Sequence, residues 1–140
     1  MMIWAFDPGA KGIGWAKWSG FGYPSTSRVG RDELYDLLNR SIQSTGTKPD
    51  VVVIEDWRLR RAAHGKTMAT SEVLGAIEFA AFCLGADVVR QPPETYKLGA
   101  MYEGFQLPNG HMPDEQSAKM HLIYYAVTHG LMRQNNPVLG

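Results

Sequence analysis

The sequence predicts an α/β domain in which helices pack on both faces of a mixed β-sheet of about five strands. Short apolar runs rich in strand-forming residues come first, and strands then alternate with helices along the chain. A length of 140 residues suits one domain with one core, so we expect residues 1–140 to form a single unit. With 44% hydrophobic and 20% charged residues, the composition is that of a globular protein.

The expected strands are recognised by their apolar and β-branched runs. The first ends at Asp7, and the turn D-P-G-A-K-G predicts that it pairs with the second strand as a hairpin. The run V-V-V-I-E is continuous and β-branched, which is typical of a strand covered on both faces. The predicted strands are 1–6, 13–18, 51–55 and 87–90, with a weak edge strand within 21–29.

The expected helices follow from apolar residues at helical spacing and from their boundary residues. Leucines recur through the first helix, and Gly85 and Gly130 are typical residues for ending the second and the last. Pro113 suits the first turn of the last helix. The predicted helices are 31–44, 71–84, 92–97 and 113–129.

The single cysteine and the apolar segments bear on the compartment. Cys83 lies in the apolar run A-A-F-C-L-G, which predicts a buried and unreactive side chain. One cysteine cannot form an internal disulfide, and Asp7 interrupts the N-terminal apolar run before a secretory signal could form, so we expect a cytosolic protein. The longest apolar segment contains Glu78 and Asp87, which favours a buried helix and strand over a membrane span.

Positive charge is concentrated in one segment, although the formal net charge is zero and gives no support to nucleic-acid binding. Directly after Glu55 the chain carries Arg58, Arg60, Arg61 and Lys66. Arginine and lysine neutralise phosphates, so this segment is a candidate DNA contact. Trp57 either stacks on an unpaired base or packs into the core.

Three acids stand at positions that strand ends and helix starts expose. Asp7 ends the first predicted strand, Glu55 ends V-V-V-I-E, and Asp114 opens the last helix. Each alone has an ordinary explanation as a turn former, a solvated strand end or a helix cap. Together they suit Mg²⁺, and two such ions roughly 4 Å apart can activate water and stabilise the oxyanion that leaves a phosphodiester. No spacing of His and Cys suggests zinc, and no motif suggests an organic cofactor.

Four segments, in this order, resemble the RuvC family of Holliday-junction resolvases, particularly its compact phage-type members. They are I-W-A-F-D-P-G-A-K-G-I-G-W-A, V-V-V-I-E, Q-P-P-E-T-Y-K and D-E-Q-S-A-K-M-H-L-I-Y-Y. The resemblance implies an RNase H-like fold, a homodimer and paired nicking of four-way or otherwise branched DNA. It also implies dependence on Mg²⁺ or Mn²⁺, with two ions expected, in the cytosol of a bacterium or a phage-infected host.

The resemblance also assigns roles to particular residues. Asp7, Glu55 and Asp114 match acids of the family, and they would hold the ions. Ser117 stands where the family carries a further acid, which implies a weaker second site. His121 shares a helix face with Ser117, where it either contacts a metal-bound water or the scissile phosphate, or packs as a hydrogen-bonded histidine.

Further residues remain open at this point. Lys11 and Lys97 lie in segments that match the family's pattern near its cleft, so they are additional phosphate candidates. Glu72 either faces the metal site or is a solvated acid of a helix first turn. Glu115 is rotated by about 100° from Asp114 around the helix, which disfavours it as a ligand.

Three alternatives to the nuclease hypothesis remain. Ser117 allows a branched-DNA-binding protein with weakened or lost catalysis. A related RNase H-like nuclease could instead act on RNA. The D-P-G opening also occurs in actin-like ATPases, but those enzymes close a second lobe over the nucleotide, which a chain of 140 residues cannot supply.

Overall fold

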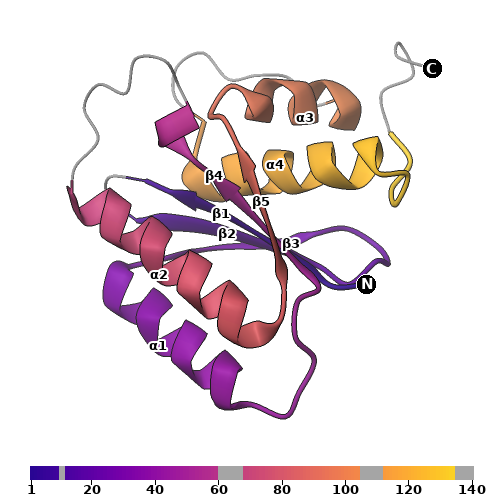
Figure 1. Ribbon diagram of the computed structural model, residues 1–140. Helices are drawn as coiled ribbons and strands as arrows, with labels where there is room; N and C mark the ends of the chain where they lie inside the picture. Colours follow the sequence, from indigo (N-terminus) through magenta and orange to yellow (C-terminus); the bar gives the residue numbers. More distant parts are fainter. Residues whose placement is uncertain (10–11, 60–67, 105–111, 135–140) are drawn as a thin grey trace.

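The chain folds around one five-stranded sheet (Figure 1). The computed structural model describes residues 1–9, 12–59, 68–104 and 112–134. Along the sheet the order is β3-β2-β1-β4-β5, so the first strand is central. The strands are β1 (Ile3–Pro8), β2 (Ile13–Trp18), β3 (Ser25–Val29), β4 (Val51–Glu55) and β5 (Asp87–Gln91).

The sheet is mixed, as the sequence predicts. β2 pairs antiparallel with β1 and with β3, whereas β4 runs parallel to β1 and to β5. Parallel neighbours require crossover connections, and helices provide them here. β1 and β4 therefore run side by side in the middle of the sheet, and their carboxyl ends lie at the same edge.

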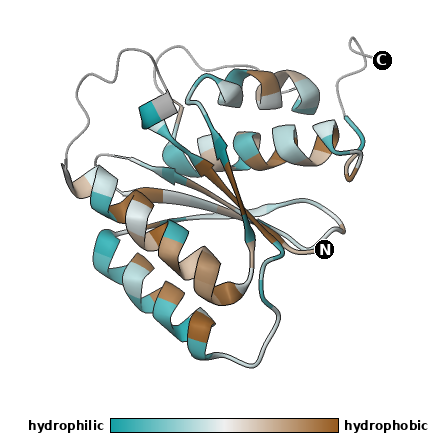
Figure 2. Cartoon of the chain, viewed as in Figure 1, coloured by the Kyte–Doolittle hydropathy of each residue, from teal (hydrophilic) through white to brown (hydrophobic). Residues whose placement is uncertain are grey.

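Two helices cover one face of the sheet, and two more lie on the other side. α1 (Arg31–Gln43) and α2 (Met68–Leu84) enclose a core with the β1 and β4 side chains Trp4, Phe6, Val52 and Ile54. α4 (Asp114–Thr128) packs against the opposite face, and α3 (Thr95–Glu103) packs on α4. Figure 2 shows hydrophobic residues gathered along the central strands, which are covered on both faces.

The boundaries of two helices differ from the sequence prediction. α2 begins at Met68, three residues earlier than expected, and a short 3-10 turn (Trp57–Leu59) follows β4. The prolines of the segment 92–94 form a turn, in which the Thr95 N–H bonds the Pro92 carbonyl, so α3 starts only at Thr95. It continues to Glu103 because Gly99 and Ala100 pack closely on α4.

The prediction of a buried cysteine is wrong. α2 buries the stripe that contains Leu74 and Ile77, and Cys83 lies outside that stripe, exposed beside Phe79 and Phe82. An apolar run in a helix does not reveal which face is covered, because the sheet covers only one side of α2. Within the described ranges, no helix is both long and apolar enough to cross a membrane.

Candidate active site

One row of residues crosses the sheet at the carboxyl ends of β1 and β4. The strand register pairs Asp7 with Gly14 and Gly14 with Arg28, and on the other side it pairs Glu55 with Gln91. The parallel pairing of β1 with β4 places Asp7 beside Glu55. Because paired residues of a sheet share a face, this row points toward α4.

α4 adds a second set of polar side chains over this row. Asp114, Ser117 and His121 recur at helical spacing and are all buried. His121 has no exposed surface, and Asp7 and Glu55 are only 5% and 9% exposed. Charged groups are rarely buried to this extent without a partner, so this polar cluster needs a physical explanation.

Asp7 and Glu55 form a directly interacting carboxyl pair. Burial raises the pKa of Asp7 well above its ordinary value, and the hydrogen bond and the negative charge of Glu55 raise it further. The Ser117 side chain, which hydrogen-bonds Asp7, and the charge of His121 act in the opposite direction with smaller effect. Two buried carboxylates repel each other, and a shared proton or a bound cation relieves that repulsion.

His121 connects Glu55 to the end of β5. Its Nδ1 lies 2.7 Å from Oε1 of Gln91, and its Nε2 lies 3.0 Å from Oε1 of Glu55. Burial lowers the pKa of His121 to about 4, so the imidazole is neutral at neutral pH and the contact with Glu55 is a hydrogen bond rather than an ion pair. The two contacts, one to Gln91 and one to Glu55, fix the orientation of the ring between the ends of β4 and β5.

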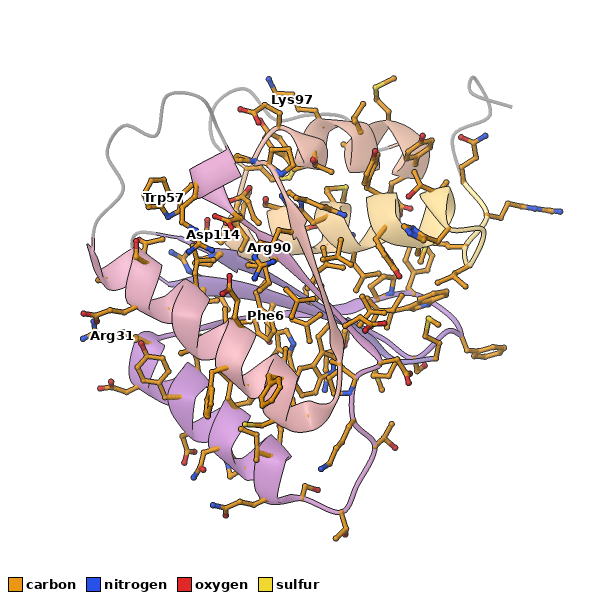
Figure 3. The ribbon with its side chains drawn as sticks, in the orientation of Figure 1. Phe6, Arg31, Trp57, Arg90, Lys97 and Asp114 are labelled. Atoms are coloured by element: carbon orange, nitrogen blue, oxygen red, sulfur yellow. The ribbon has the colours of Figure 1, made fainter. Side chains whose placement is uncertain are left out.

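Asp114 is the first residue of α4 (Figure 3), on the side of the site where β2 lies. Its carboxylate lies over Gly9, where an added Cβ would be 2.7 Å from Oδ1, and its backbone lies against Gly14. The absence of side chains at both glycines lets the start of α4 approach the sheet. A guanidinium nitrogen of Arg28 lies 3.8 Å from Oδ2 of Asp114.

A second charged cluster lies on the opposite face of the sheet and was not expected. Arg58 donates from Nε and from a terminal nitrogen to the two oxygens of Asp56, each at 2.8 Å, and it also bonds Glu78 at 2.8 Å. Arg90 joins the same Glu78 at 3.0 Å. Asp56 is buried, which acts to raise its pKa, but the bonds from Arg58 outweigh burial and hold that pKa below its ordinary value.

The guanidinium of Arg58, which we expect to contact phosphate, is bonded to two carboxylates in this structure. Trp57 is half-buried and packs against the core under α2. Glu72 is exposed and lies 3.9 Å from Arg31 of α1, so it does not face the site. Lys97 is exposed on α3 (Figure 3). The remaining candidates, Lys11, Arg60, Arg61 and Lys66, lie outside the described residues.

Gln91 is the site residue that sequence reasoning missed. It ends β5 as Glu55 ends β4, and the two are register partners. Its place in Q-P-P-E-T-Y-K, directly after a predicted strand, was a usable signal. Arg28 was missed for another reason, because β3 is a weak strand whose register with β2 cannot be derived from composition.

The donor set suits one hard cation. Asp7 and Glu55 offer carboxylate oxygens in direct proximity, and Mg²⁺ in proteins is usually held by one or two carboxylates together with water and substrate phosphate. In the part of the chain that the structure describes, no three side chains of His, Cys, Asp or Glu are grouped as ligands of one metal ion. The pair therefore fits an ion that keeps open positions for water and phosphate.

Comparison with known proteins shows a likeness in three-dimensional structure. No protein-family model matches the chain, and no curated protein is significantly similar in sequence. Among solved structures, Thermus thermophilus RuvC is 14% identical, with a TM-score of 0.60 over 96% of this chain and 99% of that chain. The chain has the RuvC fold.

Two further solved structures agree. RuvC of T. thermophilus in complex with a Holliday junction substrate gives a TM-score of 0.62 at 14% identity, over 96% of this chain and 99% of that chain. The Holliday junction resolvase of fowlpox virus gives a TM-score of 0.57 at 14% identity, over 92% of this chain and 99% of that chain. The predicted RNase H-like arrangement of a mixed sheet between helices, as in RuvC, is confirmed.

Proposed function

We propose that this chain is a metal-dependent, structure-selective endonuclease that hydrolyses phosphodiesters in branched DNA such as Holliday junctions. The observation that carries the proposal is the buried Asp7–Glu55 pair at the shared edge of two parallel strands. Two carboxyl groups buried side by side destabilise the fold, and carboxyl groups with strongly perturbed pKa values are common at functional sites. The RuvC fold, shared with structures solved as Holliday junction resolvases, supports the choice of substrate.

The reaction is an in-line displacement at phosphorus. A bound Mg²⁺ or Mn²⁺ supplies an activated water and Lewis-acid stabilisation of the phosphate charge. Asp7 and Glu55 would hold the ion, and His121, which contacts Gln91, would hold the Glu55 carboxylate in one orientation. As the water oxygen bonds to phosphorus, it gives a proton to solvent, one bridging P–O bond breaks, and the departing oxygen takes up a proton from solvent.

The DNA surface and the dimer are also proposals. Lys97 is exposed on α3, and Arg60, Arg61 and Lys66 follow Glu55 closely in the sequence, so we expect these basic residues to contact the DNA backbone. A second copy of the chain would cover the outer side of α2, where Phe79 and Phe82 are 67% and 80% exposed. Pairing two copies would place two sites on one four-way junction.

The test is cleavage of a labelled four-way junction with Mg²⁺ or Mn²⁺. Asp7→Asn should bind the junction but leave it uncut, since the amide keeps the shape and loses the charge that holds the cation. Asp36→Asn is the matched control, because Asp36 is exposed on α1 and pairs only locally with Arg40. Equal cutting by Asp7→Asn and the parent would reject the assignment.

A binding-only function is the second candidate, and Ser117 is the observation that favours it. The Ser117 hydroxyl, which hydrogen-bonds Asp7, is neutral and adds no negative charge that would attract a metal ion. Junction binding without nicks at either metal would support this candidate. Competition with an RNA–DNA hybrid in the same assay separates the RNA-directed alternative, which predicts preferential cutting of the hybrid.

A further inference from the structure

The two sides of Asp7 differ in charge. On the β4 side stands the Glu55 carboxylate, and together they form a place for one cation. On the β2 side stand the neutral Ser117 and the acid Asp114, and the guanidinium of Arg28 already lies 3.8 Å from that acid. On the second side the Asp114 carboxylate is thus already paired with a guanidinium, where a second metal ion would need several carboxylates.

The fold places Arg28 there from a distance in sequence. Arg28 follows Gly14 and Asp7 in one row across three strands, and its side chain points to the α4 face. Its Nε lies over Gly12, where an added Cβ would come within 2.8 Å. The strand pairing and the lack of a side chain at Gly12 thus hold the guanidinium at the rim of the site.

The guanidinium retains hydrogen-bonding capacity for a substrate. Its side chain is 47% exposed, whereas the Asp114 side chain is 9% exposed. A separation of 3.8 Å is longer than a hydrogen bond, so Asp114 orients Arg28 by charge without using all of its N–H groups. By contrast, Arg58 and Arg90 are bonded to carboxylates on the opposite face of the sheet.

We infer that Arg28 is a catalytic residue that contacts a non-bridging oxygen of the scissile phosphate and replaces a second metal ion, so that the site works with one divalent cation. This inference rests on the proposed nuclease function. The transition state of phosphodiester hydrolysis carries charge on the non-bridging oxygens, and a fixed cation beside them stabilises that charge.

The test combines an ion count with junction cleavage. Mn²⁺ is counted per chain by calorimetry and by electron paramagnetic resonance, and we expect one ion on the parent protein. Arg28→Gln should keep that ion and junction binding but lose about 10²–10³-fold in kcat, the usual cost of removing one charge-stabilising donor. Arg28→Lys keeps the positive charge and loses the planar guanidinium, so its kcat should lie between those of the parent and of Arg28→Gln.

A rescue experiment separates catalysis from a structural role. Ser117→Asp adds a carboxylate next to Asp7 and one turn after Asp114, so it should admit a second Mn²⁺. In the Arg28→Gln background it should then restore at least part of the lost rate, which a merely structural arginine would not allow. Arg40→Gln, on the exposed side of α1, is the control and should change nothing.

The outcomes distinguish the two levels of the proposal. A parent protein that makes no cuts refutes the nuclease function itself. If the parent cuts but binds two ions, or if Arg28→Gln cuts as fast as the parent, only the inference about Arg28 is overturned. The same holds if the double variant binds two ions and regains no activity.

Discussion

Gly14→Ala tests how closely the start of α4 must approach the sheet. Gly14 lies between Asp7 and Arg28 in the row across the strands, and the backbone of Asp114 sits directly above it. A Cβ at this position would lie 2.6 Å from the backbone nitrogen of Glu115 and still closer to the carbonyl of Asp114. Neither atom belongs to a flexible side chain, so the helix itself has to move.

The size of the effect follows from the geometry. Ordinary contact begins near 3.4 Å, so the first turn of α4 must retreat by about 1 Å. A displacement of about 1 Å of positioned groups can cost about 10²-fold in rate, and we expect that loss in kcat because Asp114 and Ser117 move with the helix. Overpacking of this kind also costs about 1–3 kcal/mol of stability.

Junction cleavage and urea unfolding measure the two effects separately. The control for stability is Gly75→Ala on α2, where an added Cβ meets nothing within 4 Å, and the control for cleavage is Asp36→Asn on the exposed side of α1. Gly75→Ala should stabilise the protein by about 0.5–1 kcal/mol, because alanine is the better helix former. If Gly14→Ala cuts at the parental rate with an unchanged urea midpoint, the tight fit between α4 and β2 is not what positions the site.

Three further predictions concern other parts of the molecule. Gln91→Leu removes the side-chain partner that orients His121 and should weaken Mn²⁺ binding, measured by calorimetry, by about 10–100-fold. An unchanged affinity would contradict the positioning role of Gln91. Asp56→Asn should lower the free energy of unfolding by about 2 kcal/mol at pH 7. Because the pKa of Asp56 is lowered in the folded state, this loss should shrink as the pH falls below the ordinary pKa of 3.8, and a loss that stays constant down to pH 3 would be inconsistent with a charge effect. At protein concentrations low enough to keep the chain monomeric, Cys83 should react fully with an aromatic disulfide reagent, whereas a thiol that reacts only in urea would show that its side chain is buried within the chain.

Local sequence determined most of the framework. Apolar and β-branched runs predict β1, β2, β4 and β5 to within one or two residues, since alternation and burial are read from neighbouring residues. The same runs end at Asp7 and Glu55, and parallel strands bring such ends to one edge, so this half of the site was predictable. Asp114 and Ser117 followed from helical spacing together with the family resemblance.

Tertiary structure alone decided the rest, because it depends on pairings between distant segments. Only the strand register places Arg28 in the same row as Asp7 and sets Gln91 beside Glu55. Only the packing of α2 shows that Arg58 bonds Asp56 and Glu78. Strand register and helix orientation depend on the apolar surface that the whole folded chain buries, and this total cannot be calculated from a short stretch of sequence.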